Sequence, residues 1–188
     1  MKTLKNITLH SLLLIIVGFG LSACSSDDGG GITPPTPTKE LTIALDPSPV
    51  YLGAGGTATV KVRITNAEKL VSWRAVINFD PAKLSVSGLK IREVAGNLLA
   101  SSGASLIESD KIVDAEAGTI TLGALAQAPG FTGVSGDGTV AQFTISSPTA
   151  DPTSVLQFMN ADLYTYPVAN PPVAKTPKKV TADVKKPS

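Results

Sequence analysis

The segment from Leu70 to Leu84 reads Leu-Val-Ser-Trp-Arg-Ala-Val-Ile-Asn-Phe-Asp-Pro-Ala-Lys-Leu. Apolar and polar side chains alternate from Trp73 to Phe79, which is typical of a β-strand with one face in a core and one face outside it. The alternation predicts four inward residues, Trp73, Ala75, Ile77 and Phe79. It predicts three outward residues, Arg74, Val76 and Asn78.

The strand is expected to end at Asp80-Pro81. An Asp carboxylate accepts the free backbone amides of a short turn, and Pro has no amide to leave unsatisfied. We expect the turn to contain Ala82 and Lys83 and to fold Leu84 back under the strand.

Similar alternating segments, separated by Gly, Pro, Asn and Asp, occur along the rest of the chain. Besides the central strand, they are residues 41–46, 57–65, 86–91, 98–106, 111–114, 119–125, 139–145, 155–158, 161–166 and 180–184. Turns are expected at Gly53–Gly56 and at Asp137-Gly138, and the last strand is expected to pair near the first. Many short strands at regular spacing predict an all-β sandwich or barrel.

Three ordered motifs resemble the cohesin family. Phe79-Asp80-Pro81, two further residues and Leu84 resemble the end of the third cohesin strand. Gly136–Ile145 (Gly-Asp-Gly-Thr-Val-Ala-Gln-Phe-Thr-Ile) is similar to the family's Gly-Asp-Gly turn and next strand, and 156–163 is similar to a late strand. The resemblance covers roughly residues 41–184. It implies a nine-stranded β-sandwich with jelly-roll-like topology that binds dockerin modules in polysaccharide-degrading assemblies.

The N-terminal segment is predicted to be an export signal. Lys2 and Lys5 precede an apolar run over 12–21 that is too short for a comfortable membrane span. The run ends in Leu21-Ser22-Ala23-Cys24, which resembles the bacterial lipoprotein box. That resemblance implies removal of residues 1–23 and acylation of Cys24. The alternative is an ordinary signal peptide with an incidental cysteine.

Residues 24–39 are rich in Gly, Pro and Thr and are predicted to form a flexible tether, with a reach of at most roughly 45 Å. The cohesin-like domain is then expected over residues 40–188. Ser25 after the acylated cysteine suggests sorting to the outer membrane or cell surface, by analogy with enteric bacteria. Membrane lipid is therefore one expected partner.

Composition excludes several classes of function. Removal of Lys2 and Lys5 leaves 14 basic against 15 acidic residues, so no nucleic-acid partner is expected. The only histidine and the only cysteine are His10 and Cys24, so the mature domain lacks Ser-His and Cys-His triads, common zinc sites and disulfides. We expect no catalytic residue, no cofactor and no metal. A cluster of carboxylates is interpreted as a solvated face, with loose calcium binding and a glycosidase-type pair of carboxylates as the alternatives: Glu108, Asp110, Asp114 and Glu116.

The resemblance implies that a protein partner lies across the outward side of the central strand, a neighbouring strand and its loop. The matching positions are Arg74, Val76, Asn78, Ala124, Gln127 and Gly130. Arg74 and Val76 stand where cellulosomal cohesins tend to place Asn and Asp, and Gln127 stands where they often place Glu. This difference leaves open whether the partner is dockerin-like. The alternative is that Arg74 and Asn78 are merely solvated and that a loop covers Val76.

Two other functions remain possible at this stage. Cohesins share their architecture with carbohydrate-binding modules, and Tyr164 and Tyr166 lie two apart on one strand face, where they would form a sugar platform or a half-buried pair. Trp73 is expected in the core. A passive envelope protein is the third possibility, with a basic C-terminal region either touching acidic polymers or solvating an edge strand: Lys175, Lys178, Lys179, Lys185 and Lys186.

Overall fold

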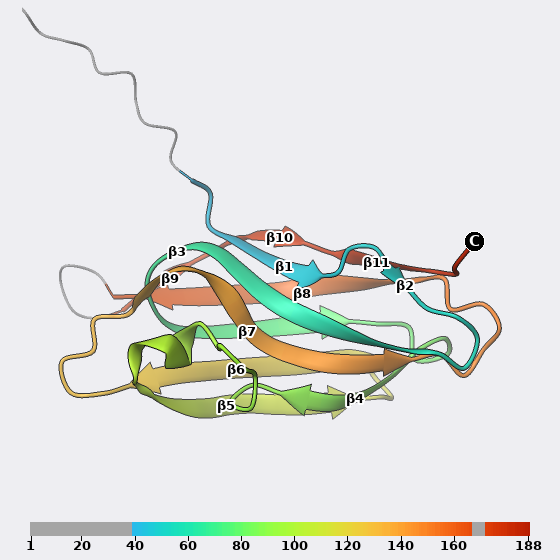
Figure 1. Cartoon of the computed structure of the whole chain (residues 1–188), viewed down its shortest axis with the longest axis horizontal. Helices are drawn as coiled ribbons and strands as arrows, with labels where there is room; N and C mark the ends of the chain where they lie inside the picture. Colours follow the sequence, from blue (N-terminus) through green and yellow to red (C-terminus); the bar gives the residue numbers. More distant parts are fainter. Residues whose placement is uncertain (1–38, 167–171) are drawn as a thin grey trace, which may run out of the picture. The chain divides into compact units, whose positions relative to one another are not determined.

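The computed structural model describes residues 39–166 and 172–188, which form a β-sandwich with one short 3₁₀ helix (Figure 1). The strands are β1 Thr42–Asp46, β2 Val50–Tyr51, β3 Thr57–Asn78, β4 Ser85–Lys90, β5 Ser105–Asp114, β6 Thr119–Gln127, β7 Val134–Ser146, β8 Ser154–Thr165, β9 Val173–Lys175, β10 Lys178–Val180 and β11 Ala182–Lys185. The helix η1 is Leu99–Ser102.

Strand β3 connects the two layers of the sandwich. Its first half pairs with β1 and β7, and its second half pairs with β6 and β8. Between the halves, Asn66 and Lys69 have left-handed backbones with φ of 56° and 50°. The N–H of Asn66 donates to Asp137 Oδ1 at 2.7 Å, and the N–H of Lys69 donates to Ser135 Oγ at 3.0 Å. These bonds support the kink that carries the chain from one layer to the other.

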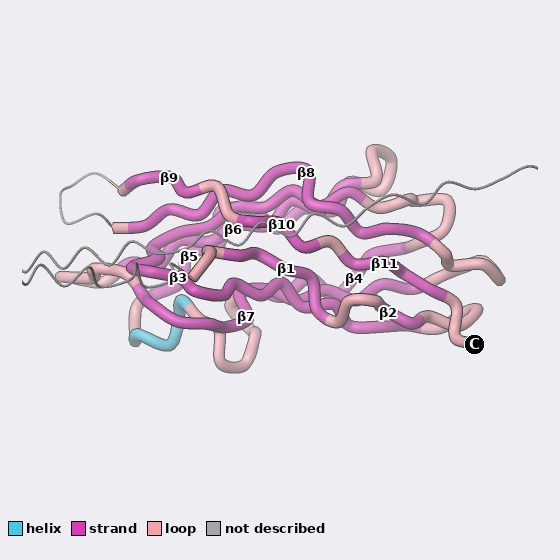
Figure 2. Tube along the Cα trace, turned by 90° about the horizontal axis from the view of Figure 1, so that it is seen from above, coloured by secondary structure: helices cyan, strands magenta, loops and turns pink. Residues whose placement is uncertain are grey.

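The hydrogen-bonded pairs define the order of each layer. Layer one runs β4, β7, the first half of β3, β1 and β10. Layer two runs β5, β6, the second half of β3 and β8, whose far edge pairs with β11 at one end and with β9 at the other. Viewed at right angles, β8 lies on one side of the sandwich and β7 on the other (Figure 2).

The expected all-β sandwich is confirmed, and its first and last strands lie side by side. β10 runs parallel to β1 in layer one, whereas β11 runs parallel to β2 in layer two. Counting β1 with β2 and β10 with β11 as interrupted strands, and β3 as two halves, gives the nine expected strands plus the short β9. Both ends of the domain thus cross between the layers.

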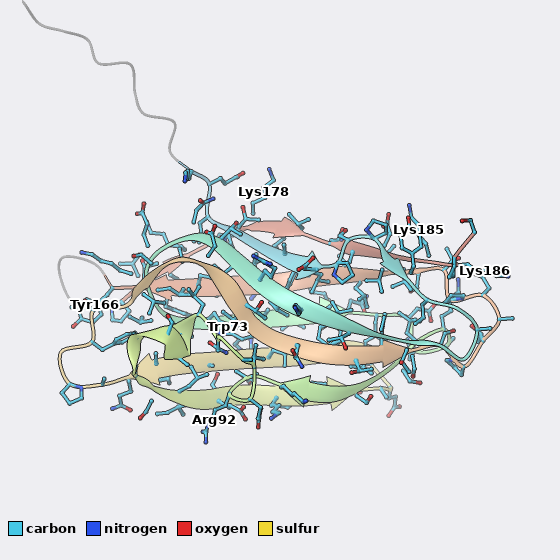
Figure 3. All side chains as sticks on the ribbon, viewed as in Figure 1. Trp73, Arg92, Tyr166, Lys178, Lys185 and Lys186 are labelled. Atoms are coloured by element: carbon cyan, nitrogen blue, oxygen red, sulfur yellow. The ribbon has the colours of Figure 1, made fainter. Side chains whose placement is uncertain are left out.

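The core lies between the inward faces of the two layers and contains the predicted inward residues. Trp73, Ala75 and Ile77 are at most 1% exposed. The indole of Trp73 lies inside the sandwich (Figure 3), where its Nε1 makes no hydrogen bond with the described residues. The Asp80 turn also forms as expected, because the N–H of Ala82 donates to Asp80 Oδ1 at 3.0 Å and Leu84 is buried.

The strand expected over 98–106 is wrong in its first half. Residues Leu99–Ser102 form η1, and β5 begins only at Ser105. The buried Asn97 decides this, because its amide donates to the carbonyls of Ile91 and Val140 and its Oδ1 accepts from the N–H of Leu99, each at 2.9 Å. A side chain that bonds its neighbouring backbone in this way replaces the ladder of a strand.

Two other expected boundaries are wrong. Residues 155–158 and 161–165 belong to one strand, β8, which bulges where Phe158 pairs with Ile77 and Asn160 pairs with Val76, and Tyr166 lies just beyond its end. Asp137-Gly138 is not a hairpin turn but part of β7, at the irregular stretch that follows the kink in β3. Asp137 is needed there as the acceptor for Asn66.

Residues 24–38 of the expected tether and the expected export signal with Cys24 lie outside the described residues. Within residues 39–166 and 172–188, no helix has the length and apolar character needed to cross a membrane.

Candidate functional site

The solvent-facing side of layer two, formed by β5, β6, the second half of β3 and β8, is called the outward face here. Along β3, Trp73, Ala75 and Ile77 are buried, whereas Arg74 and Asn78 are exposed and Val76 is half-buried. The predicted alternation of the central strand is therefore confirmed. Three of the expected partner-binding residues, Arg74, Val76 and Asn78, do share this face.

Arg74 forms an ion pair that passes over β6. In the sheet, Arg74 lies beside Gly123, which lies beside Asp110 on β5. The Nε of Arg74 donates to Asp110 Oδ2 at 3.2 Å. A Cβ on Gly123 would lie 2.6 Å from Ser109 Oγ and 3.1 Å from Asp110 Oδ2. The ion pair between Arg74 and Asp110 therefore requires a glycine at position 123, because any side chain there would lie between them.

A second carboxylate lies on the other side of Arg74. Asp162 of β8 is the register partner of Arg74, and its Oδ2 accepts a hydrogen bond from Asn160 Nδ2 at 2.9 Å. The middle of the outward face thus carries the row Asp110, Arg74 and Asp162. Neither Asp110 nor Asp162 was assigned to this face from the sequence. For Asp162 the available signal was its spacing of two residues from Tyr164, which places both on one side of β8.

Apolar side chains flank this charged row. On one side of the row, Leu125 of β6 pairs with Ile107 of β5. On the other side, Thr121 of β6 pairs with Val76 of β3 and with Ile112 of β5. Ile107 and Ile112 are 41% and 56% exposed, which is unusual for large aliphatic residues. The outward face therefore has a charged centre with partly exposed apolar residues on both sides.

Ala124 does not belong to this face. Its side chain is 0% exposed and points into the core with Leu122 and Ala126, while Gly123 and Leu125 point outward. The expectation that Ala124 contacts a partner is therefore corrected. From Leu122 to Ala126 both faces of β6 carry apolar or small residues, so the sequence pattern did not reveal which side faces out.

An open groove of about 620 Å³ lies at one end of the outward face. It brings together two pairs of residues that the sequence had assigned to different partners, Gln127 with Gly130 and Tyr164 with Tyr166. Its other lining residues are Val71, Ser72, Leu125, Ala126, Ala128, Phe131, Thr132 and Pro172. Tyr164 and Tyr166 are half-buried, and Tyr166 lies at the opposite end of the sandwich from Lys185 and Lys186 (Figure 3).

The backbone next to the groove is held close to the kink in β3. The N–H of Tyr166 donates to the carbonyl of Lys69 at 2.7 Å. Gly133 packs so close to Lys69 that a Cβ would lie 2.3 Å from its carbonyl carbon, and its φ is 94°. Gly133 is therefore needed for the loop from β6 to β7 to lie against this end of the sandwich.

The carboxylates expected to cluster near the β5–β6 turn are dispersed. Glu108 accepts the N–H of Arg92 at 3.1 Å, Asp110 faces outward, and Asp114 Oδ1 accepts the N–H of Ala117 in the turn at 2.8 Å. Within residues 39–166 and 172–188, no three His, Cys, Asp or Glu side chains are grouped so as to hold a metal ion.

Lys111 partly neutralises the acidic edge of β5. Its Nζ lies 3.5 Å from a carboxylate oxygen of Glu93 and 3.5 Å from one of Glu108. The pKa of Glu93 is lowered from its usual value, first by a hydrogen bond from its own backbone N–H and further by the charge of Lys111. These carboxylates are thus engaged with protein groups.

Among the basic residues of the C-terminal region, Lys175, Lys178 and Lys179 lie on the short edge strands β9 and β10, whereas Lys185 ends β11, which pairs with both β8 and β2. Lys178 forms an ion pair with Glu40 at 3.1 Å, Lys185 lies 3.8 Å from Asp183, and Lys179 Nζ donates to the carbonyl of Met159 at 3.1 Å. Lysines on short edge strands hinder unwanted strand pairing.

Comparison with known families identifies the domain. Residues 48–181, more than half of the chain, match the family model described as Cohesin domain. The chain belongs to the cohesin family. No curated protein sequence matches this cohesin closely enough to be significant.

Solved cohesin structures share the fold. A non-cellulosomal cohesin from Archaeoglobus fulgidus is 18% identical with a TM-score of 0.57, covering 80% of this chain and 93% of that one. The OlpA cohesin of Clostridium thermocellum, solved with Doc918, is 20% identical with a TM-score of 0.61, covering 79% and 99%. A type II cohesin from the cellulosome of Acetivibrio cellulolyticus is 15% identical with a TM-score of 0.60, covering 78% and 95%.

Cohesin domains are non-catalytic modules that take part in protein–protein interaction. The predictions that this chain carries a cohesin domain and that it is not an enzyme are therefore confirmed. The particular residues expected to contact a partner remain predictions.

Proposed function

We propose that this cohesin binds a dockerin-bearing protein through its outward face. The observation that carries the proposal is the row of Asp110, Arg74 and Asp162 with partly exposed apolar residues on both sides. Arg is enriched among the few residues that carry most of the binding energy of an interface, and such residues lie near its centre with other contacts around them that exclude water. The outward face has both within four adjacent strands.

The solved relatives support the choice of partner class. The OlpA cohesin forms a complex with Doc918, and a ScaC cohesin of Acetivibrio cellulolyticus forms a complex with the ScaB dockerin. Val76 and Gln127 stand where cellulosomal cohesins tend to place acidic residues, and this difference argues against such a partner. The position of Asp110 and Asp162 beside Arg74 supplies carboxylate acceptors from neighbouring strands instead. A dockerin would therefore meet acidic acceptors at altered positions.

Affinity capture tests the proposal. Residues 40–188 serve as bait for secreted and envelope proteins of the source organism. The bait with Val76→Asp and Arg74→Glu adds two negative charges to the outward face and removes the positive charge of Arg74, so we expect it to lose the partner. The matched control is Lys61→Glu, because Lys61 is exposed on layer one.

A protein with calcium-loop repeats that is retained by the native bait and by Lys61→Glu, but not by the outward-face variant, supports the proposal. Equal retention by all three baits contradicts it.

We further propose that the protein is a lipoprotein, anchored by acylated Cys24 in the bacterial outer membrane or at the cell surface. The lipoprotein-box residues Leu21 to Cys24 and the tether composition support this. Two or more acyl chains give stable anchoring, whereas one gives only marginal binding. The native protein should partition into detergent and Cys24→Ser should not. Equal partitioning of the two forms contradicts the anchor.

A further inference from the structure

The groove at the Tyr166 end of the sandwich differs chemically from the rest of the surface. Its twelve lining residues include three aromatic side chains, Phe131, Tyr164 and Tyr166, and no charged one. The adjacent hollow, which shares only Tyr166 with it, is lined by Lys39, Glu40, Glu68, Lys69 and Lys175 among others. The absence of charge is therefore a property of the groove and not of the whole end of the domain.

The groove also presents polar atoms that have no partner within the described part of the chain. No hydrogen bond joins the side chains of Ser72, Gln127, Thr132 or Tyr164 to any other described residue. Tyrosine combines an apolar ring with a hydroxyl group, so it packs against a ligand and also hydrogen-bonds to it. The groove thus joins apolar aromatic surface with available hydroxyl and amide groups.

From these features we infer that the groove binds a neutral saccharide chain. Sugar rings have apolar faces of C–H groups and edges of hydroxyl groups, which match aromatic rings and uncharged polar side chains respectively. A charged sugar would lose hydration without meeting a cation in the lining, and an isolated charge is costly to desolvate. The volume of about 620 Å³ lies within the ~300–1,000 Å³ typical of small-ligand sites.

The shape and position of the groove agree with a chain-like ligand. It is open to solvent and does not enclose its contents, so a polymer can lie in it without threading. Tyr164 and Tyr166 both line the groove, so a chain-like ligand would meet more than one aromatic ring. This activity goes beyond dockerin binding, although the groove borders the outward face at Ser72 and Leu125 and includes Gln127 and Gly130, which are expected to contact a protein partner.

Calorimetric titration tests the inference. The chain from residue 24 onward, with Cys24→Ser to prevent acylation, is titrated with neutral hexasaccharides of the cello-, xylo-, manno- and malto- series. Oligogalacturonate serves as the acidic probe, and a proline-rich peptide serves as the probe for a competing occupant.

We expect at least one neutral hexasaccharide to bind and oligogalacturonate not to bind. Tyr164→Ala should weaken the affinity at least roughly tenfold, equivalent to about 1.4 kcal/mol. Gln127→Ala, a change at an exposed residue that leaves the core intact, should weaken it severalfold. Tyr51→Ala is the matched control, because Tyr51 is 62% exposed and does not line the groove, so its affinity should equal the native value.

Three results would overturn the inference. In the first, no neutral hexasaccharide binds at millimolar concentration. In the second, the native, Tyr164→Ala and Gln127→Ala proteins bind equally well. In the third, only the peptide or the acidic oligomer binds.

Discussion

Arg74 and Asp110 lie on strands that are not neighbours, yet their side chains meet across β6, with 3.2 Å between Nε and Oδ2. The strand between them has its only glycine at the crossing point, Gly123. A polar contact at the centre of the outward face thus requires a residue without a side chain on the intervening strand.

Replacing that glycine should therefore destabilise the domain. In Gly123→Ala the new Cβ would lie 2.6 Å from Ser109 Oγ, 3.1 Å from Asp110 Oδ2 and 3.2 Å from the carbonyl oxygen of Trp73. The two side chains could move away only by disturbing the ion pair region, and the backbone oxygen cannot rotate away. We expect a loss of about 1–3 kcal/mol in the free energy of unfolding, as for other overpacked sites. Urea unfolding measures it.

The control for this change is Gly53→Ala, where nothing lies within 4 Å of the new Cβ. It should change stability by less than about 0.5 kcal/mol. A Gly123→Ala protein as stable as the control would contradict the close packing over β6.

The ion pair itself should contribute little to stability. The side chains of Arg74 and Asp110 are 47% and 23% exposed, so solvent screens their attraction. A double-mutant cycle with Arg74→Gln and Asp110→Asn should give a coupling of about 0.2–1 kcal/mol. The coupling should decrease as salt is added, because salt screens exposed charges. A coupling that salt leaves unchanged would show that the pair is more shielded than its exposure indicates.

Asn97 should contribute more to the stability of the domain than a typical loop residue does. It is 2% exposed and its side chain makes three hydrogen bonds, to Ile91, Leu99 and Val140. Asn97→Ala leaves buried backbone groups without partners, at about 1–3 kcal/mol for such a group. Because more than one group is affected, we expect the free energy of unfolding, measured with urea, to fall by at least about 2 kcal/mol.

Asn78→Ala provides the comparison for Asn97, since Asn78 is exposed and lies in a strand of the same domain. Its unfolding free energy should stay within about 0.5 kcal/mol of the native value. Equal losses at the two positions would refute the role of the Asn97 hydrogen bonds.

Local features of the fold were predictable where one strand face is clearly apolar. The alternation from Trp73 to Phe79 identified the inward and outward residues of the central strand, and Asp80 identified the turn that follows. Both depend only on neighbours in sequence, namely the period of a strand and the capping of free amides.

Features that depend on contacts between distant residues were not predictable. The kink in β3 depends on Asp137 and Ser135, which lie far along the chain. Asp110 faces outward because of a register shift between Glu108 and Asp110, which breaks the simple alternation of β5. The groove unites Gln127 with Tyr164 only because β6 and β8 flank the same half of β3.

The most direct test of the central proposal is an NMR titration of the isotope-labelled domain with the dockerin module of the captured partner. We expect the largest changes in backbone amide signals on the outward face, at Arg74, Val76, Gly123, Leu125 and Asp162. Changes concentrated instead on layer one, in β4, β7 and β1, with the signals of those five residues unmoved, would contradict it.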